Sequence, residues 1–290
     1  MLRRRGARRG ATLLELLVAM VLAAVLLGAA SSTLVRQRRS ASGQATRVRA
    51  ESQVRAALGE LEVALDGLSP AAGDLVAGEA RDTALQLRTV IAGAVACDST
   101  MGQATLAAAD TSEGRASGVA AAPRAGDTLW WRPPGAAAWV ARRVTIVTTN
   151  TGVCAAGGSG VQALLRLGFL LPDTVPRGAP LRLTRQARYS FYHASDGSWQ
   201  FGISEWSDVL HAFPPPQPVA GPFVLVAPGG ARTGFRYFDA GGSALSIGAQ
   251  GASVVNVARV RVTLVAPDHA PGELASFRRE SLDVALSHAP

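Results

Sequence analysis

Residues 11–35 read ATLLELLVAMVLAAVLLGAASSTLV, and this stretch decides the fold. Glu15 is its only charged residue, so residues 16–35 form an uncharged run of 20 residues. A helix of this length is about 30 Å long, which matches the hydrocarbon core of a bilayer. We therefore predict one membrane-spanning helix, since no second stretch of the chain is comparable. The bulky apolar residues of this predicted span are Leu16, Leu17, Val18, Val21, Leu22, Val25, Leu26 and Leu27.

The residues flanking this stretch are basic. Five arginines lie in residues 1–9, and the positive-inside rule places that end in the cytoplasm. Arg36, Arg38 and Arg39 flank the other end, so the charge bias is modest. The N-terminal arginines account for five of the eight net positive charges of the 290-residue chain, which leaves +3 for the other 281 residues. The overall basicity therefore does not by itself indicate an anionic partner for the whole protein.

Three interpretations of the segment compete. A secretory signal peptide would be cleaved near the small residues Gly28, Ala29 and Ala30, whereas an ordinary signal anchor would keep the helix. Neither gives Glu15 a role, although a carboxylate in lipid costs about 2.5–3.5 kcal/mol at the bilayer centre. A twin-arginine signal on Arg8 and Arg9 fits the residues that follow poorly. The third interpretation is a prepilin-type signal.

The run RRGATLLELLVA at residues 8–19 resembles the class III signal of type IV pilins and type II secretion pseudopilins. The resemblance implies that prepilin peptidase cuts after Gly10 and that Ala11 becomes the methylated mature N-terminus, although most members of the family begin with Phe or Met. It makes Glu15 the fifth mature residue, which in this family neutralises the N-terminal amine of a neighbouring subunit during assembly. Glycine at the cut allows the backbone a close approach to the protease. Pairing offsets the cost of desolvating each charge.

The helix is predicted to continue beyond the membrane. No proline occurs between Val35 and Pro70, and the intervening residues favour helix. Apolar residues recur at helical spacing, which predicts a helix that continues to about residue 65 and lays an apolar stripe against a globular domain. A coiled-coil seam is the alternative, but two heptads are too few to prefer it. The stripe consists of Val54, Leu58, Leu61, Leu65 and Leu68.

From about residue 80 onward, short runs with strand periodicity alternate with turn residues. In residues 257–264 the alternation places Arg259, Arg261 and Thr263 on a solvated face, as in antiparallel sheets. The predicted fold class is α+β, a long N-terminal helix packed on an antiparallel sheet. The predicted strands are residues 84–91, 128–132, 139–148, 161–171, 181–193, 199–204, 223–227, 234–239, 254–265 and 276–286.

These elements predict the organisation of the chain. Residues 213–222, FPPPQPVAGP, read as a semi-rigid connector. The predicted parts are a leader (1–10), a transmembrane helix (11–35), an extended amphipathic helix (36–68), a β-rich part (69–212), the connector (213–222) and C-terminal strands (223–290).

The C-terminal part adds to the resemblance. Gly234-Phe235-Arg236-Tyr237-Phe238-Asp239, followed by Gly241-Gly242 and the strand at 257–264, is similar in order to J-type minor pseudopilins and W-type minor pilins. The resemblance implies a minor subunit of a type IV pilus or type II secretion pseudopilus, anchored once in a bacterial inner membrane with its C-terminal domain in the periplasm. Its implied partners are prepilin peptidase and other pilin or pseudopilin subunits. The alternative function is a membrane-anchored or secreted periplasmic binding protein without a role in assembly.

Cys97 and Cys154 are the only cysteines. Outside the cytoplasm their pairing is favoured, and closing this loop would contribute roughly 4 kcal/mol; free buried thiols are the alternative. The four histidines show no ligand spacing, and signatures of hydrolases, phosphate loops and metalloproteases are absent. We therefore predict neither a catalytic residue nor a metal or cofactor. DNA binding would need arginines clustered with aromatic residues, which the sequence does not show, so nucleic acid is not a predicted partner.

Overall fold

The structure is a computed structural model in which the chain divides into two compact units, residues 1–49 with 268–276 and residues 50–267 with 277–290. It describes residues 13–66, 68–76, 80–98, 100–107, 118–119, 121–133, 135–136, 139–154, 161–170, 173–227, 229–247, 253–268 and 276–286.

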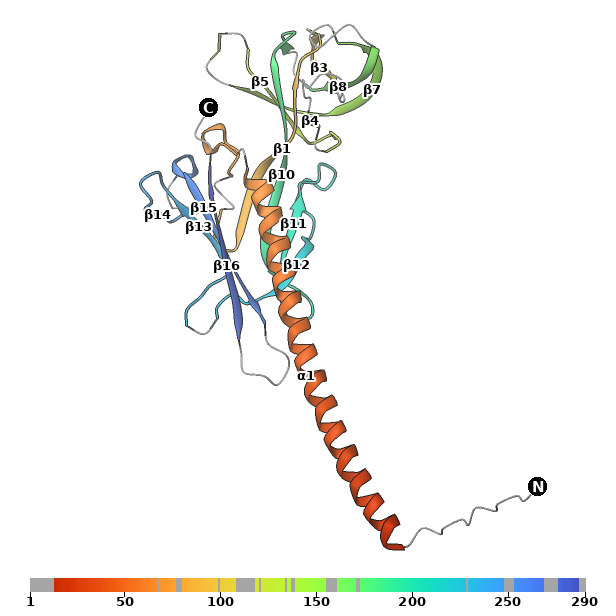
Figure 1. Ribbon diagram of the computed structural model, residues 1–290. Helices are drawn as coiled ribbons and strands as arrows, with labels where there is room; N and C mark the ends of the chain where they lie inside the picture. The colour runs from red at the N-terminus through yellow and green to blue at the C-terminus, as the bar shows by residue number, and fades with distance from the viewer. Residues whose placement is uncertain are drawn as a thin grey trace, which may run out of the picture. The chain divides into compact units, whose positions relative to one another are not determined.

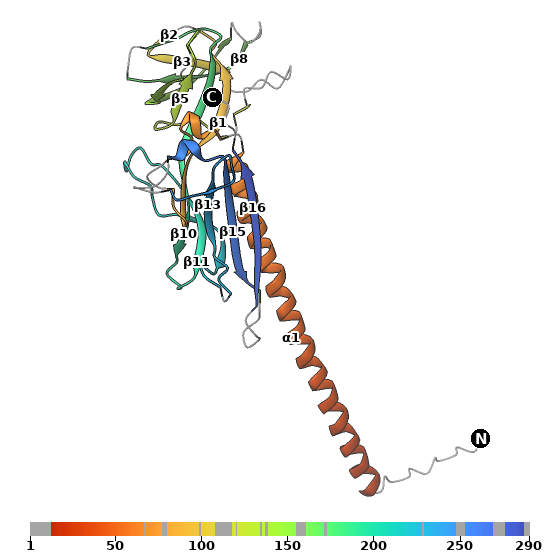
Figure 2. The ribbon, with the colours of Figure 1, turned by 90° about the vertical axis from the view of Figure 1, so that its left-hand side faces the viewer.

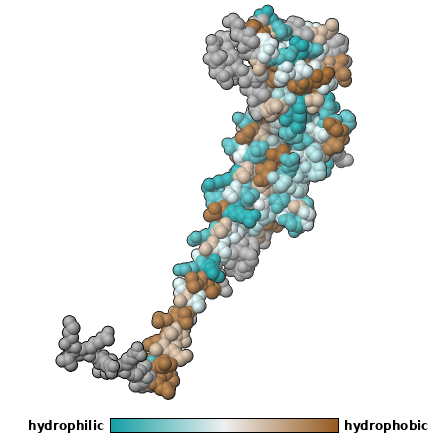
Figure 3. Space-filling view, turned by 90° about the vertical axis from the view of Figure 1, so that its right-hand side faces the viewer, coloured by the Kyte–Doolittle hydropathy of each residue, from teal (hydrophilic) through white to brown (hydrophobic). Residues whose placement is uncertain are grey.

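Helix α1, Leu13–Leu65, is one continuous helix of 53 residues. Within the described residues it is the one helix long and apolar enough to cross a membrane. The eight bulky residues of the predicted span lie on it and are 48–70% exposed. Figure 3 shows apolar residues gathered over the N-terminal turns of α1. This segment is therefore an apolar helix whose side chains remain available to lipid or to other helices.

The C-terminal turns of α1 belong to the second unit and contribute to its core. Val54, Leu61 and Leu65 are completely buried and Leu58 is partly buried, whereas Val63 on the opposite side of the helix is 77% exposed. Leu68, just after the helix, is also buried. The apolar stripe thus lies against the core, as its spacing predicts.

The second unit is built from antiparallel sheets (Figure 1). The largest has the order β12-β11-β10-β1-β4, with β5 paired to β10 and to β6. Its strands are β1 (Ala84–Val95), β4 (Gly118–Val119), β5 (Thr128–Trp131), β6 (Val140–Arg143), β10 (Pro180–His193), β11 (Trp199–Glu205) and β12 (Gln217–Phe223). One long helix with antiparallel sheets confirms the predicted α+β fold class.

A four-stranded sheet has the order β14-β13-β15-β16, and Figure 2 shows β13, β15 and β16 side by side. Its strands are β13 (Gly234–Phe238), β14 (Ala244–Leu245), β15 (Arg259–Pro267) and β16 (Phe277–Ala285). The smaller sheets are β3-β8-β7, from β3 (Gln103–Ala107), β7 (Ile146–Val153) and β8 (Val161–Gly168), and β2-β9, from β2 (Thr100–Met101) and β9 (Thr174–Val175). Two short 3₁₀ helices are Pro70–Ala72 and Val254–Asn256.

The long strands β1 and β10 pass through two apolar cores. Near one end of the ladder, Leu85 and Leu87 of β1 join Tyr189 and Phe191 of β10 in the core that contains α1. Near the other end, Ile91, Ala92, Leu181 and Leu183 belong to a second core with Trp131 and Phe169. A register shift lies between Val90 and Ala92. The two cores are therefore joined by one continuous strand pair.

The Pro-rich stretch differs from its prediction. Strand β12, Gln217–Phe223, lies where a connector over residues 213–222 was expected, and the strand predicted at 223–227 is wrong. Within the described sheet β12 is an edge strand that pairs with β11. Proline is tolerated in an edge strand because its missing N–H can face away from the ladder. Similarly, the strand predicted at 139–148 is two strands, β6 and β7.

The two cysteines lie at strand ends. Cys97, just after β1, and Cys154, just after β7, form a disulfide with a Cα–Cα distance of 4.6 Å. Both are buried, together with Leu164. The bond closes a loop with a sequence separation of 57, for which the chain-entropy model gives about 4 kcal/mol. It fastens the three-stranded sheet to the end of the ladder.

Leu61→Ala should lower the free energy of unfolding by about 2–5 kcal/mol, because it leaves a cavity beside a completely buried position. Chemical denaturation of the purified full chain measures this loss. The matched control is Val63→Ala, which removes apolar atoms from the exposed side of the same helical turn and should change stability by only about 0.5 kcal/mol. Equal losses would contradict the assignment of the buried face.

Candidate functional site

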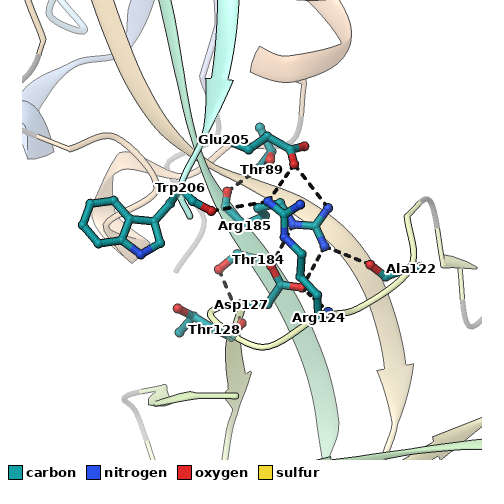
Figure 4. Close-up of polar contacts among 9 residues, drawn as sticks. All are labelled: Thr89, Ala122, Arg124, Asp127, Thr128, Thr184, Arg185, Glu205 and Trp206. Carbon is teal, nitrogen blue, oxygen red and sulfur yellow. Dashed lines mark hydrogen bonds and ion pairs between the residues drawn. The ribbon is translucent and has the colours of Figure 1, made fainter. Parts of the chain in front are cut away.

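A buried ion-pair cluster lies on the β1–β10 ladder between the two cores (Figure 4). Arg185 of β10 is 7% exposed, and its Nε and Nη2 donate to the two carboxylate oxygens of Asp127 at 2.8 and 2.9 Å. Asp127, one residue before β5, is 1% exposed. The hydrogen bond to Asp127 raises the pKa of Arg185, and burial opposes this rise. A bidentate guanidinium–carboxylate pair is the geometry that best compensates buried charges.

The cluster continues outward toward solvent. Arg124 lies 2.7 Å from Glu205, and both side chains are 46% exposed. Arg185 Nη1 lies 3.7 Å from the same Glu205 oxygen. The Arg124 backbone N–H donates to Asp127 at 2.8 Å, and Arg185 Nη2 also donates to the Ala122 carbonyl. The cluster therefore joins β10, β11 and the segment before β5.

Neighbouring polar residues fix the same part of the ladder. Thr89 of β1 donates its hydroxyl to the Arg185 carbonyl at 3.2 Å, and Trp130 Nε1 donates to the Thr184 hydroxyl at 2.9 Å. Asp74, completely buried, pairs with Arg182 at 2.6 Å and also accepts from the Ser69 backbone N–H. The contacts of Asp74 attach the segment that follows α1 to β10.

A pocket of about 740 Å³ lies beside the ion-pair cluster. Arg124, Glu205 and Trp206 line it together with prolines of the segment before β12. Chemically this arrangement offers a mixed polar and apolar surface. No group of three or more metal-ligating side chains occurs among the described residues. The pocket can therefore receive a side chain or small ligand, but its geometry does not indicate a reaction.

The predicted assembly residue Glu15 lies in the first turn of α1 and is exposed. The helix dipole favours a carboxylate at this end. Gly10 and Ala11, the predicted processing residues, lie outside the described residues. The structure thus places Glu15 at the start of the apolar helix, and the position of the cut stays a prediction from sequence.

Comparison with known families singles out this same end of the chain. Residues 5–31 match the family model of the prokaryotic N-terminal methylation motif. The match supports the prepilin-type family, whose members are processed by prepilin peptidase and assemble with other pilins. It also supports anchoring in a membrane through the apolar helix α1. No curated protein and no solved structure matches the chain.

The methylation motif covers Glu15 and the predicted span as far as residue 31, but none of the sheets. In the sheets, the sequence patterns do not predict the Arg185–Asp127 pair. The sequence does contain an indication of this pair. Arg185 is two residues from Leu183 and from Ala187, which are both buried, so its side chain points to the same buried side of the strand. An arginine on the buried side of a strand needs a carboxylate partner, but the alternation of apolar and polar residues does not identify which carboxylate it is.

Arg185→Met should destabilise the protein by about 3–5 kcal/mol, because it leaves Asp127 buried without its counter-charge. The second change Asp127→Leu, combined with Arg185→Met, should recover most of this loss. Urea unfolding of the wild type and the variants tests both statements. Arg143→Met is the control, since its pair with Asp208 is partly exposed and should contribute about 0–1 kcal/mol. A double variant as unstable as the sum of the two single variants would refute this account of the pair.

Proposed function

We propose that the chain is a minor pilin or pseudopilin. Prepilin peptidase would cut it between Gly10 and Ala11, and the mature protein would join a type IV pilus or a type II secretion pseudopilus at its tip or in its initiating complex. The observation that carries the proposal is the methylation motif at residues 5–31 directly on a single long apolar helix. The family of this motif is structural rather than enzymatic.

The exposed apolar segment of α1 supports an assembly role. Its side chains can pack first against lipid and then against the helices of neighbouring subunits, because both surroundings are apolar. Within this segment the carboxylate of Glu15 would pair with the N-terminal amine of an adjacent subunit. Such a pair offsets desolvation only when both partners are present, so it would fix the register between subunits.

The globular part supports a minor rather than a repeating subunit. Residues 50–267 with 277–290 form a large unit with two apolar cores, and repeating subunits in this family are usually smaller. Strands β13 and β15 are formed by the residues whose sequence pattern resembles that of J-type pseudopilins and W-type pilins. The disulfide supports an extracytoplasmic location, where such bonds persist.

Processing is tested by mass spectrometry of the mature protein. We expect loss of residues 1–10, with or without a methyl group on Ala11, and accumulation of the uncut chain in Gly10→Val. Gly6→Val is the matched control, because it changes a glycine of the same leader away from the cut and should be processed normally. A mature N-terminus near Ser31, or an intact Met1, would instead indicate a signal peptide or a signal anchor.

The role of Glu15 is tested separately. Glu15→Gln should reduce incorporation into filaments by roughly tenfold or more, since it removes one charge-assisted interaction, while membrane insertion is unchanged. Immunoblots of sheared filaments and of membranes give the two quantities. Asp98→Asn, which also removes one negative charge but lies exposed after β1, should incorporate normally. Normal incorporation of Glu15→Gln would remove this explanation of the residue.

A further inference from the structure

A second pocket, of about 240 Å³, lies on the solvent face of the β13–β15–β16 sheet. Four arginines line it, and Asp82 is the one acidic residue among its described lining residues. Gly234 and Thr263, which are register partners, also line it. A Cβ at Gly234 would come within 2.4 Å of the Asp82 carbonyl oxygen, so this position admits only glycine. The arginines are Arg232, Arg236, Arg261 and Arg279.

Pairing of the strands brings these charges together. Arg236 of β13 lies directly opposite Arg261 of β15, and Arg279 of β16 lies opposite Val265, four residues further along β15. Like charges directly opposite on adjacent strands destabilise a sheet. The opposed arginines therefore lower the stability of the sheet, so the stability of the fold does not account for their presence.

Charge compensation within the chain is incomplete. Arg261 Nε donates to both oxygens of Asp283 at 2.9 and 3.0 Å, and Arg259 lies 3.8 Å from the same carboxylate. One carboxylate thus serves two arginines. In the part of the chain that the structure describes, Arg232, Arg236 and Arg279 form no ion pair with a carboxylate. All three are exposed, so they are available to an external anion.

Phe238, the aromatic residue on this face, bears on which class of anionic partner the arginines can bind. The guanidinium groups of Arg259 and Arg261 lie 4.6 and 5.2 Å from the centre of the Phe238 ring. A ring in contact with two guanidinium groups is not open for base stacking, on which proteins depend to bind single-stranded nucleic acids. The basic face is also only three strands wide, about 10 Å, which suits one or two acidic groups rather than a long phosphate track.

We propose that this pocket binds carboxylate side chains of an acidic segment on a protein partner. Planar guanidinium forks match carboxylates bidentately, and a concentrated positive field favours and orients such an encounter. The inference goes beyond the assembly role proposed above and does not depend on it, since the pocket lies in the sheet and not in the N-terminal helix.

Binding of a capped hexaglutamate peptide to the purified full chain at low ionic strength tests the proposal, with hexaglutamine as the uncharged probe. We expect saturable binding of hexaglutamate that weakens with added salt. Arg236→Gln should weaken it by about tenfold, and Arg236→Gln with Arg279→Gln by about a hundredfold, because each change removes one charge-assisted contact. These substitutions should not lower the thermal unfolding midpoint, because the side chains are exposed and Arg236→Gln removes an opposed like charge.

Arg166→Gln is the matched control, since Arg166 is an exposed arginine of β8 in another sheet and its loss changes net charge equally. It should leave hexaglutamate affinity unchanged. Equal affinity in the wild type and the Arg236/Arg279 double variant, or absence of binding, would overturn the proposal. Tighter, patch-dependent binding of a thymidine oligonucleotide of equal charge would overturn it in favour of nucleic acid. The assay needs neither processing nor filaments, so its failure is distinguishable from failure of the proposed assembly role.

Discussion

The antiparallel pairing of β1 with β10 is the interaction on which the globular unit depends. Eleven residue pairs join the two strands, from Ala84 with Ser190 to Val95 with Pro180. Both apolar cores are built on this one ladder, and β5, β11 and β4 pair with one strand or the other. Because side chains alternate between faces, a slip of one residue would turn every core residue of a strand outward. Its register therefore determines both cores at once.

The Arg185–Asp127 pair favours one register of β10 with β5, the strand that begins directly after Asp127. Leu183, Arg185 and Ala187 point to the same side of β10, and Arg185 lies where one core ends and the other begins. If β5 slipped along β10, Arg185 would lose its two hydrogen bonds to Asp127, and a buried carboxylate would remain without a counter-charge. Apolar contacts alone discriminate weakly between similar packings, whereas an unpaired buried charge is strongly unfavourable.

The sequence predicts the features that depend on neighbouring residues in the chain. The uncharged run after Glu15, the helical spacing of Val54 and Leu61, and the outward-facing Arg259 and Arg261 all follow from local periodicity. It does not predict features that depend on which strands pair. The position of β12 follows from its place at a sheet edge, where proline is tolerated, and the partner of Arg185 lies 58 residues away.

The distribution of charge likewise has one part that the sequence predicts and another that depends on strand pairing. The net charge of +8 is mostly carried by the N-terminal arginines, which bear on membrane orientation, and the remaining +3 suggests a nearly neutral domain. Strand pairing nevertheless gathers Arg236, Arg261 and Arg279 on one face of the second sheet. These arginines are far apart in the sequence, but the pairing of β13, β15 and β16 places them on one positively charged surface. The match to the methylation motif ends at residue 31, so these tertiary surfaces are formed by parts of the chain that the motif does not cover.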